Sequence, residues 1–352
     1  MAAPARAEDK VEVHGSYFRE ASTRIIQPML QLTKDLPLGF DVAAHGLVDA
    51  VTSASVAQGA TQDDIFTETR KEAGLRAGKT FSWNRTRVGG VYRHSAEPDY
   101  GSHTLGVEAS TGVWDQTGVL GARLARTSDT IGPNRNLALK TWFFGVGYEQ
   151  PLSPTVVAQL VYEAFYQDGY LANVYLRVPN LGRERAPAER IRHATSLRLA
   201  KYFPSLGLGL QAAYRLYVDQ DFGPRLEPWG LVAHTAEARI FYAFTQNFEI
   251  RLGYRYHSQG AASFWCNTDP SRGGRTDCYG RSPAYASVDV KWGSLATHLP
   301  EIKLFYDLRR LGSVPGLRHF AAGTVHVSYG YMFQSSRYGG AHLLQSGYSY
   351  PF

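Results

Sequence analysis

Apolar and polar side chains alternate with a period of two along most of the chain from Val11 onwards. Successive side chains of a β-strand point to opposite faces, so this alternation is typical of strands with one apolar and one polar face. Turn-forming clusters separate the alternating segments, and no helical period interrupts them. The pattern predicts an all-β fold of about sixteen strands, at 11–17, 24–34, 40–49, 68–81, 85–94, 104–113, 117–127, 139–148, 155–166, 192–203, 206–219, 231–244, 248–257, 301–309, 323–334 and 341–352.

The four segments between 192 and 257 show the alternation most clearly, with Leu, Ala, Ile and Tyr on one face and charged residues on the other. In a soluble sandwich the apolar face would form the core. In a transmembrane antiparallel barrel it would face lipid, and the charged face would line the lumen. Periodicity alone allows both. The barrel interpretation predicts these charged lumen-lining residues: Arg192, Arg198, Arg215, Asp219, Glu237, Arg239, Glu249, Arg251 and Arg255.

The connections between the predicted strands alternate between short and long, which favours a barrel with short periplasmic turns and longer outer loops. The long loops are 168–190 and 259–299, and either could fold inward or present a surface. Pro28 falls inside a predicted strand. Because proline has no backbone N–H and a closed barrel has no free edge, we expect a bulge there.

The last segment, 341–352, places Leu344, Tyr348, Tyr350 and Phe352 on one face. An aromatic strand that closes on Phe is similar to the C-terminal signal that the assembly machinery of Gram-negative outer membranes reads. We therefore expect Tyr348, Tyr350 and Phe352 to form that signal, although a soluble sandwich could also end on such a strand. Both termini in the periplasm require an even number of strands, which agrees with the count of about sixteen.

Composition agrees with a barrel, because Gly (35), Tyr (22) and Phe (17) are abundant. The mean hydropathy is −0.28, and the sequence has no apolar run of roughly 18 residues, as a membrane-spanning helix requires. Barrel strands of about 9–11 residues do not need one. The net charge of +6 is spread through the strands and forms no basic block, which argues against nucleic-acid binding.

The N-terminus contains Ala5-Arg6-Ala7, a small-x-small pattern that resembles a signal-peptidase site. The basic start and apolar core of a signal peptide are absent. Residues 1–10 are interpreted as a signal-peptide remnant left by a late start codon or a truncation, or as a plain disordered tail. Residues 11–352 are expected to form a single outer-membrane barrel domain.

The two cysteines, Cys266 and Cys278, flank a loop rich in Gly, Pro and Asp. In an oxidising compartment this arrangement favours a disulfide that closes the loop and stabilises the fold by about 3 kcal/mol. Two free thiols are the alternative. No histidine lies near enough in sequence to suggest a metal site.

Several phrases together resemble a known family. They are Tyr17-Phe-Arg-Glu, Asp49-Ala-Val-Thr-Ser-Ala-Ser55, Arg190-Ile-Arg-His-Ala194, Tyr214-Arg-Leu-Tyr-Val-Asp219, His234-Thr-Ala-Glu237, Tyr254-Arg-Tyr-His-Ser-Gln259 and Ala261-Ala-Ser-Phe264. Their order and spacing resemble the proteobacterial outer-membrane family catalogued as domain of unknown function 3570, over essentially the whole chain from Val11. The resemblance implies an outer-membrane β-barrel in a Gram-negative bacterium and supplies no activity.

No sequence motif indicates a cofactor or a metal. His234 and Glu237 are three residues apart and would point to opposite faces of a strand, so they do not form half of a metal site. Asp63-Asp64 could suggest an outer-membrane hydrolase, but adjacent strand residues also diverge, and this is the least favoured alternative. We therefore expect a non-enzymatic protein without cofactors.

The charged inner faces predict function. On the inner faces of the four segments between 192 and 257, arginines outnumber acidic residues. This predicts a porin-like channel for small polar or ionic solutes with a mild anion preference. Pairing of opposite charges across neighbouring strands is their structural role. The alternative function is a barrel plugged by its loops or by a partner, acting as a scaffold or assembly component. Expected partners are outer-membrane lipid and the barrel-assembly machinery, with a periplasmic or lipoprotein partner as a further candidate.

Overall fold

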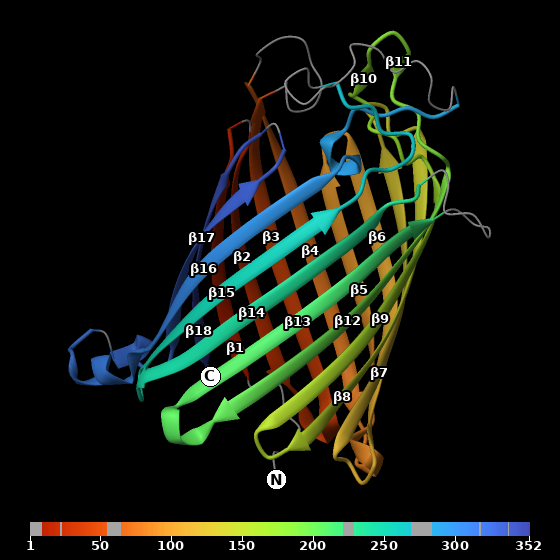
Figure 1. Cartoon of the computed structure of the whole chain (residues 1–352). Helices are drawn as coiled ribbons and strands as arrows, with labels where there is room; N and C mark the ends of the chain where they lie inside the picture. The colour runs from red at the N-terminus through yellow and green to blue at the C-terminus, as the bar shows by residue number, and fades with distance from the viewer. Residues whose placement is uncertain are drawn as a thin grey trace.

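The computed structural model describes residues 9–21, 23–54, 65–220, 229–268, 284–316, 318–336 and 338–352. Within these ranges, sixteen strands pair antiparallel into one closed barrel, in which β1 pairs with β18 (Figure 1). Every other strand of the barrel pairs with its neighbours in sequence, and β9 pairs with β12. This confirms the predicted all-β barrel and its strand number.

The barrel strands are β1 (Lys10–Arg19), β2 (Thr23–Asp35), β3 (Phe40–Ala54), β4 (Ile65–Thr80), β5 (Arg87–Glu97), β6 (Tyr100–Val113), β7 (Gly118–Ile131), β8 (Leu137–Ser153), β9 (Val156–Gly169), β12 (Glu189–Phe203), β13 (Leu208–Gln220), β14 (Val232–Thr245), β15 (Phe248–Gln259), β16 (Leu295–Asp307), β17 (Thr324–Gln334) and β18 (Ala341–Pro351). A separate hairpin consists of β10 (Arg177–Val178) and β11 (Gly182–Arg183). The short 3-10 helices are η1 (Pro37–Gly39), η3 (Trp83–Arg85), η4 (Pro204–Leu206), η6 (Val290–Trp292), η7 (Leu308–Ser313) and η8 (Arg318–Phe320).

Alternate residues of each strand expose apolar side chains on the outside of the barrel, and we call this the outer face. Leu105 is 65% exposed and Leu197 is 55% exposed, for example, although both lie in the middle of strands. The opposite face, here called the lumen face, carries most of the charged residues of the strands. Among the described residues, no helix is long and apolar enough to cross a membrane.

The first and last strands close the barrel at their shared end. Lys10 pairs with Pro351, and the backbone N–H of Phe352 donates to the carbonyl oxygen of Asp9 at 2.9 Å. Lys34 on β2 forms an ion pair with Asp9, and its ammonium lies 4.8 Å from the centre of the Phe352 ring. Hydrogen bonds from Lys34 and from the backbone N–H of Asp35 lower the pKa of Asp9.

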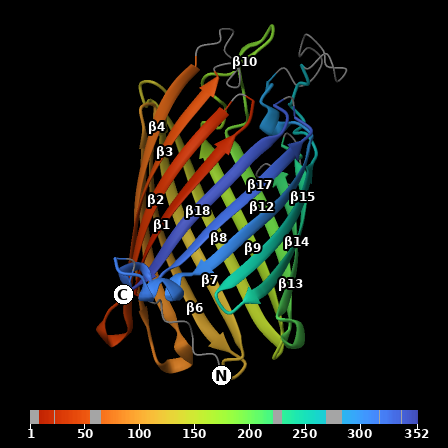
Figure 2. The same ribbon diagram turned by 90° about the vertical axis from the view of Figure 1, so that its left-hand side faces the viewer.

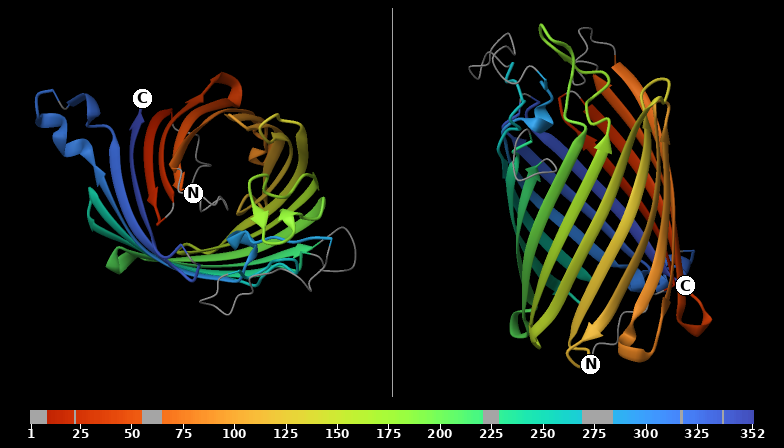
Figure 3. Two further views of the ribbon diagram at one scale, coloured as in Figure 1. Left: turned by 90° about the horizontal axis from the view of Figure 1, so that it is seen from above. Right: turned by 90° about the vertical axis from the view of Figure 1, so that its right-hand side faces the viewer.

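Both ends of the described chain lie at the same end of the barrel, which we call the terminus end (Figure 2). The opposite end, called the loop end, carries the connections after β3, β9, β13 and β15. Most connections at the terminus end are short, as predicted. The connection between β16 and β17 is an exception, because it contains η7 and η8 and projects outward from the wall (Figure 3).

Two strand prolines interrupt the ladder without changing its register. Ile26 pairs with Ala50 and Met29 with Leu47, so the β2–β3 register is the same on both sides of Pro28. The bulge predicted at Pro28 is therefore wrong, because the ladder omits the pairs that would need the missing N–H instead of inserting a residue. Pro300 interrupts the β16–β17 ladder in the same way. The register shifts lie at Pro151/Ser153 and Ala243/Thr245.

The loop that was expected at 259–299 is shorter in the structure, because β16 already begins at Leu295. Cys266 is buried, but Cys278 lies outside the described residues, so the disulfide stays a prediction. Residues 1–8 of the expected signal-peptide remnant at 1–10 also lie outside the described residues, and so do Asp63 and Asp64.

Candidate functional site on the lumen wall

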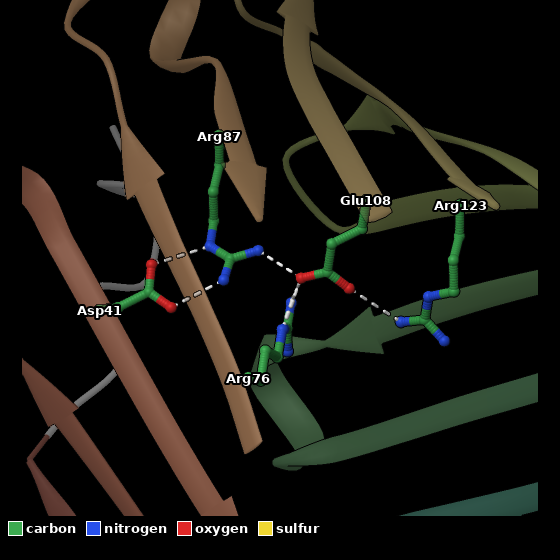
Figure 4. Close-up of polar contacts among 5 residues, drawn as sticks. All are labelled: Asp41, Arg76, Arg87, Glu108 and Arg123. Carbon is green, nitrogen blue, oxygen red and sulfur yellow. Dashed lines mark hydrogen bonds and ion pairs between the residues drawn. The ribbon is translucent and has the colours of Figure 1, made fainter. Parts of the chain in front are cut away.

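Five charged residues from five consecutive strands meet on the lumen face (Figure 4). They are Asp41 on β3, Arg76 on β4, Arg87 on β5, Glu108 on β6 and Arg123 on β7. Their strands were predicted correctly, but these five residues were not among the predicted site residues. The available signal was the alternation itself, which places each of them on the polar face of its strand.

Glu108 is the acceptor on which three arginines converge. Arg76 and Arg87 each approach Oε1 at 2.5 Å, and Arg123 approaches Oε2 at 3.3 Å. Arg87 also binds Asp41 in a bidentate pair, with Nε–Oδ1 and Nη2–Oδ2 distances of 2.9 and 2.7 Å. The planar guanidinium of Arg87 therefore bridges two carboxylates, a geometry that an ammonium group cannot reproduce.

Two glycines give Arg87 the space for this bridge. A Cβ atom at Gly78 would lie 2.3 Å from Nη2 of Arg87, and one at Gly89 would lie 3.2 Å from Nη1. The Arg87 side chain thus lies across β4 and β5 to reach Asp41. The absence of side chains at these two positions is part of what builds the cluster.

A cavity of about 310 Å³ lies against this cluster. Arg76, Arg87, Glu108, Arg123 and Glu163 contribute its charged lining. Small residues on β7 and β8, including Gly121 and Gly147, leave room for the cavity against the wall. The site is thus a polar recess in the wall whose carboxylates are each bound by at least one guanidinium group.

The predicted lumen residues of β12–β15 lie together on the lumen face. The register pairs Arg192 with Asp219, Arg215 with Thr235 and Glu237 with Arg255, opposite the exposed Leu, Ile and Tyr side chains of the outer face. The remaining members, which the same alternation places on this face, are Arg198, Arg239, Glu249 and Arg251.

Two of the four ion pairs that the structure describes in this sector join residues on one strand. Arg239 pairs with Glu237 at 2.8 Å, and Arg251 pairs with Glu249, two residues away in each case. Arg215 pairs with Glu163 of β9 at 3.3 Å, across the intervening β12. Cross-strand pairing between immediate neighbours was the expectation, and it holds for Asp219 of β13, which pairs with Arg190 of β12.

Two arginines of this sector contact aromatic rings. The guanidinium of Arg251 lies 3.8 Å from the ring centre of Phe305, and that of Arg192 lies 4.4 Å from the ring centre of Phe165. Arg198 and Arg255 form no ion pair with any residue that the structure describes. They are the guanidinium groups of this sector most available to a solute.

Asp219 is fully buried and binds Arg190, not its register partner Arg192. Nε of Arg190 donates to both carboxylate oxygens at 2.9 Å, and the Tyr217 hydroxyl donates to Oδ2 at 3.2 Å. By sequence, Arg190 falls at the end of the predicted loop 168–190, so it is not among the predicted lumen residues. In the structure β12 starts at Glu189, so Arg190 belongs to the polar face of that strand.

The loop-end connections pack against this buried pair. Trp229 and Trp292 lie 4.5 and 4.6 Å from the Arg190 guanidinium, and both contact Phe264. Trp229 and Phe264 are 0% and 1% exposed. Because Arg190 is on the lumen face, the described parts of these connections cover the inner wall at β12–β14.

A second group of loop contacts joins the connection after β9 to the connection after β15. Glu184 accepts hydrogen bonds from the hydroxyl of Ser287 and from the backbone N–H of Asn173. Burial raises the pKa of Glu184, and the Ser287 hydrogen bond opposes that shift. These contacts hold the described loop segments in one arrangement over the loop end.

The charge on the lumen face differs around the ring. By strand order, β3–β6 and β12–β15 lie on roughly opposite sides of the barrel. Arginines outnumber carboxylates on β12–β15, where Arg190 joins the predicted set. Carboxylates outnumber arginines on β3–β6, whose lumen face carries Asp41, Asp49, Glu68, Glu72, Glu97 and Glu108 against Arg70, Arg76, Arg87 and Arg93.

One described group of carboxylates could hold a cation. Oxygen atoms of Glu68, Glu97 and Asp99 lie within 4.8 Å of one another near the loop end. Tyr175 donates a hydrogen bond to Asp99, and burial together with that carboxylate raises the pKa of Tyr175. Three partly exposed carboxylates are common on surfaces, so we assign them no metal.

Comparison with known proteins finds one matching family model. Residues 137–311 match the family model described as "Protein of unknown function (DUF3570)". The match makes this segment of the chain similar to DUF3570. It runs from β8 to η7 and includes the arginine-rich sector, whereas the resemblance noted above extends to Val11. No curated protein sequence matches the chain.

Solved structures share the barrel of the chain at low sequence identity. CdiB from Acinetobacter baumannii gives a TM-score of 0.57 at 10% identity, covering 99% of this chain and 61% of that chain. A bacterial polysaccharide outer membrane secretin gives 0.54 at 7%, covering 99% and 100%. Pseudomonas aeruginosa OccK8 (OprE) gives 0.50 at 9%, covering 97% of each chain. The fold is therefore that of outer-membrane β-barrels.

Proposed function

We propose that the protein is a passive outer-membrane channel for small polar or ionic solutes. The observation that carries the proposal is the inversion of the usual pattern, with apolar side chains outside and charged ones inside. A barrel of about sixteen strands is wide enough to leave an aqueous channel. The recess of about 310 Å³ beside Glu108 would then be part of the solute path.

The outer face supports a location in a bilayer. At the terminus end, Lys79 lies 4.7 and 5.3 Å from the rings of Phe40 and Phe81, and Lys201 lies 5.7 Å from the ring of Phe203. Lysines beside aromatic residues are typical of the interface between lipid and water. The proposed location is the outer membrane, with the terminus end in the periplasm and Tyr348, Tyr350 and Phe352 as the assembly signal.

The distribution of charge argues for weak selectivity. The mild anion preference was based on β12–β15 alone, and the carboxylates of β3–β6 offset it. Opposite charge on the two sides of the lumen would create a transverse field, which orients a polar solute without strongly excluding either sign of ion. Small zwitterionic or polar molecules are therefore the solute class that suits the wall best.

A plugged scaffold is the second candidate, and one observation favours it. Trp229, Phe264 and Trp292 cover the inner wall at β12–β14. The described loops do not line the recess against β4–β9, however, so we rank the channel first. The proposed function is not enzymatic.

Solute entry into liposomes tests the proposal. Liposomes containing the folded protein are expected to swell in isotonic sugars, faster for pentoses than for trisaccharides. Gly121 lines the recess, and a Cβ atom there meets nothing closer than 3.7 Å. Gly121→Trp should therefore fold and slow the swelling by filling part of the lumen.

Gly46→Trp is the matched control, because Gly46 is on the outer face and a Cβ atom there meets nothing within 4 Å. Liposomes that contain this variant should swell at the wild-type rate. An absence of swelling with folded wild-type protein would contradict the channel, and so would equal effects of the two tryptophans.

A further inference from the structure

Five tyrosine–histidine pairs recur on the outer face in the loop-side half of the strands. In each pair the tyrosine hydroxyl is hydrogen-bonded to Nδ1 of the histidine, at distances from 2.6 to 3.1 Å. The pairs are Tyr92–His103, Tyr162–His193, Tyr214–His234, Tyr254–His298 and Tyr329–His342.

The same register position produces every pair. The tyrosine is on the strand that rises to the loop end, and the histidine lies two residues before the tyrosine's partner on the next strand. Tyr214 pairs with Ala236, for example, and Tyr329 pairs with Leu344. Such diagonal neighbours are within reach of long and aromatic side chains. The repetition on five hairpins shows one structural motif.

The hydrogen bond leaves the outer edge of the imidazole available. When a phenol donates to Nδ1, the imidazole proton resides on Nε2, which then acts as a donor. Apart from His193, whose Nε2 lies 3.5 Å from Gln220, these histidines are exposed. Within the described structure their Nε2 atoms have no protein partner. In that tautomer each offers a donor to the surroundings.

A row of three basic residues joins this motif at the closure of the barrel. On the outer face, His342 of β18 pairs with Arg19 of β1, and Arg19 pairs with Arg24 of β2. Both arginines are exposed. Like charges directly opposite each other on neighbouring strands are destabilising. An anion bound between them would remove that penalty.

The whole outer face is short of negative charge. In the strands that the structure describes, its carboxylates are Asp168 and Glu189 alone, both at the loop end of the β9–β12 hairpin. The outer face of the loop-side half also carries Lys71, Arg126 and Lys140. A neutral lipid would not require this excess, whereas an anionic headgroup would neutralise it.

We propose that this outer-face belt binds phosphate groups of the glycolipid in the leaflet at the loop end, with His342, Arg19 and Arg24 as its strongest site. The proposal rests on the outer-membrane location proposed above, which places a phosphorylated glycolipid at the loop end. Arginines would bind phosphate in bidentate fashion, and each Nε2–H would add one donor. The tyrosines would hold the imidazoles with their donors outward.

Binding of defined lipids to the detergent-folded full chain tests the proposal. The probes are bis-phosphorylated lipid A, its dephosphorylated form and phosphatidylglycerol, with bound lipid counted by native mass spectrometry. Wild type is expected to prefer bis-phosphorylated lipid A over the dephosphorylated form by on the order of tenfold, the effect of one charge-assisted hydrogen-bond set. Arg19→Gln/Arg24→Gln/His342→Phe should reduce the preference to about twofold or less.

Lys34→Gln/Lys79→Gln/Lys201→Gln is the matched control, because it removes three cations from the outer face at the terminus end. It should keep the wild-type preference. Tyr329→Phe is the second test, for the case in which the basic triple variant does not fold. It keeps His342 but loses the hydroxyl that orients the imidazole. It should weaken the preference for bis-phosphorylated lipid A by about twofold to threefold.

Equal binding of the two lipid A forms by wild type would overturn the inference. Binding of phosphatidylglycerol as strong as that of bis-phosphorylated lipid A would also overturn it. So would an equal loss of the lipid A preference in the basic and the lysine triple variants. A protein that conducts but does not discriminate between phosphorylated and dephosphorylated lipid would refute this inference and leave the channel intact. Discrimination without conductance would refute the channel alone.

Discussion

Replacing Arg190 by alanine is expected to lower the free energy of unfolding by about 3–5 kcal/mol, the cost of leaving one partner of a buried ion pair alone. Asp219 is 0% exposed, and Tyr217 would be its only remaining side-chain donor among the described residues. Trp229 and Trp292 would also lose the guanidinium that lies beside both rings. Urea unfolding in lipid vesicles, followed by tryptophan fluorescence, measures the effect.

Two variants control for this expectation. Arg198 is on the same strand and face but is exposed, so Arg198→Ala should cost about 0.5 kcal/mol or less. The double variant Arg190→Met/Asp219→Leu removes both charges and should recover most of the lost stability. Equal losses for Arg190→Ala and Arg198→Ala would show that the buried pair does not hold the loop cluster.

Glu108→Gln is expected to change both stability and ion selectivity. Three guanidinium groups would lose their shared carboxylate, at a cost of about 1–3 kcal/mol. The loss of one negative charge beside three arginines should shift the reversal potential in a salt gradient towards anion selectivity. Bilayer recordings with a KCl gradient measure that shift.

Glu163→Gln is the matched control for Glu108→Gln. Glu163 lines the same recess but is 33% exposed and has one arginine partner, at 3.3 Å. Its replacement should cost about 0–1 kcal/mol and shift the reversal potential less. If the two variants behaved alike, the convergence of arginines on Glu108 would have no functional weight.

Most of the fold could be predicted from the alternating pattern, because each alternating segment is recognised from its own residues alone. The even number of strands also followed from the sequence, because both termini were expected in the periplasm. Strand ends were less accessible. β16 was expected to begin at Glu301, because Pro300 resembled a strand boundary. In the structure it begins six residues earlier, at Leu295, and only the ladder pairs next to Pro300 are absent.

The candidate site was harder to predict, because it depends on which strands neighbour one another and in what register. The alternation placed Arg192 and Asp219 on one face, but not Arg190, whose strand membership became clear only from its pairing with Gln167 of β9. The Asp41–Arg87 bridge needs the empty positions at Gly78 and Gly89. Predicting the tyrosine–histidine pairs would likewise require the register of the five strand pairs that carry them.

Single-channel recording in planar bilayers tests the central claim most directly, that the charged lumen conducts. The protein folded in detergent, with the barrel verified by its β-type circular dichroism, is added to one side of the membrane. A conducting lumen should give discrete conductance steps with a reversal potential near zero in a KCl gradient. Folded protein that inserts and yet gives no steps would contradict it and would favour the plugged scaffold.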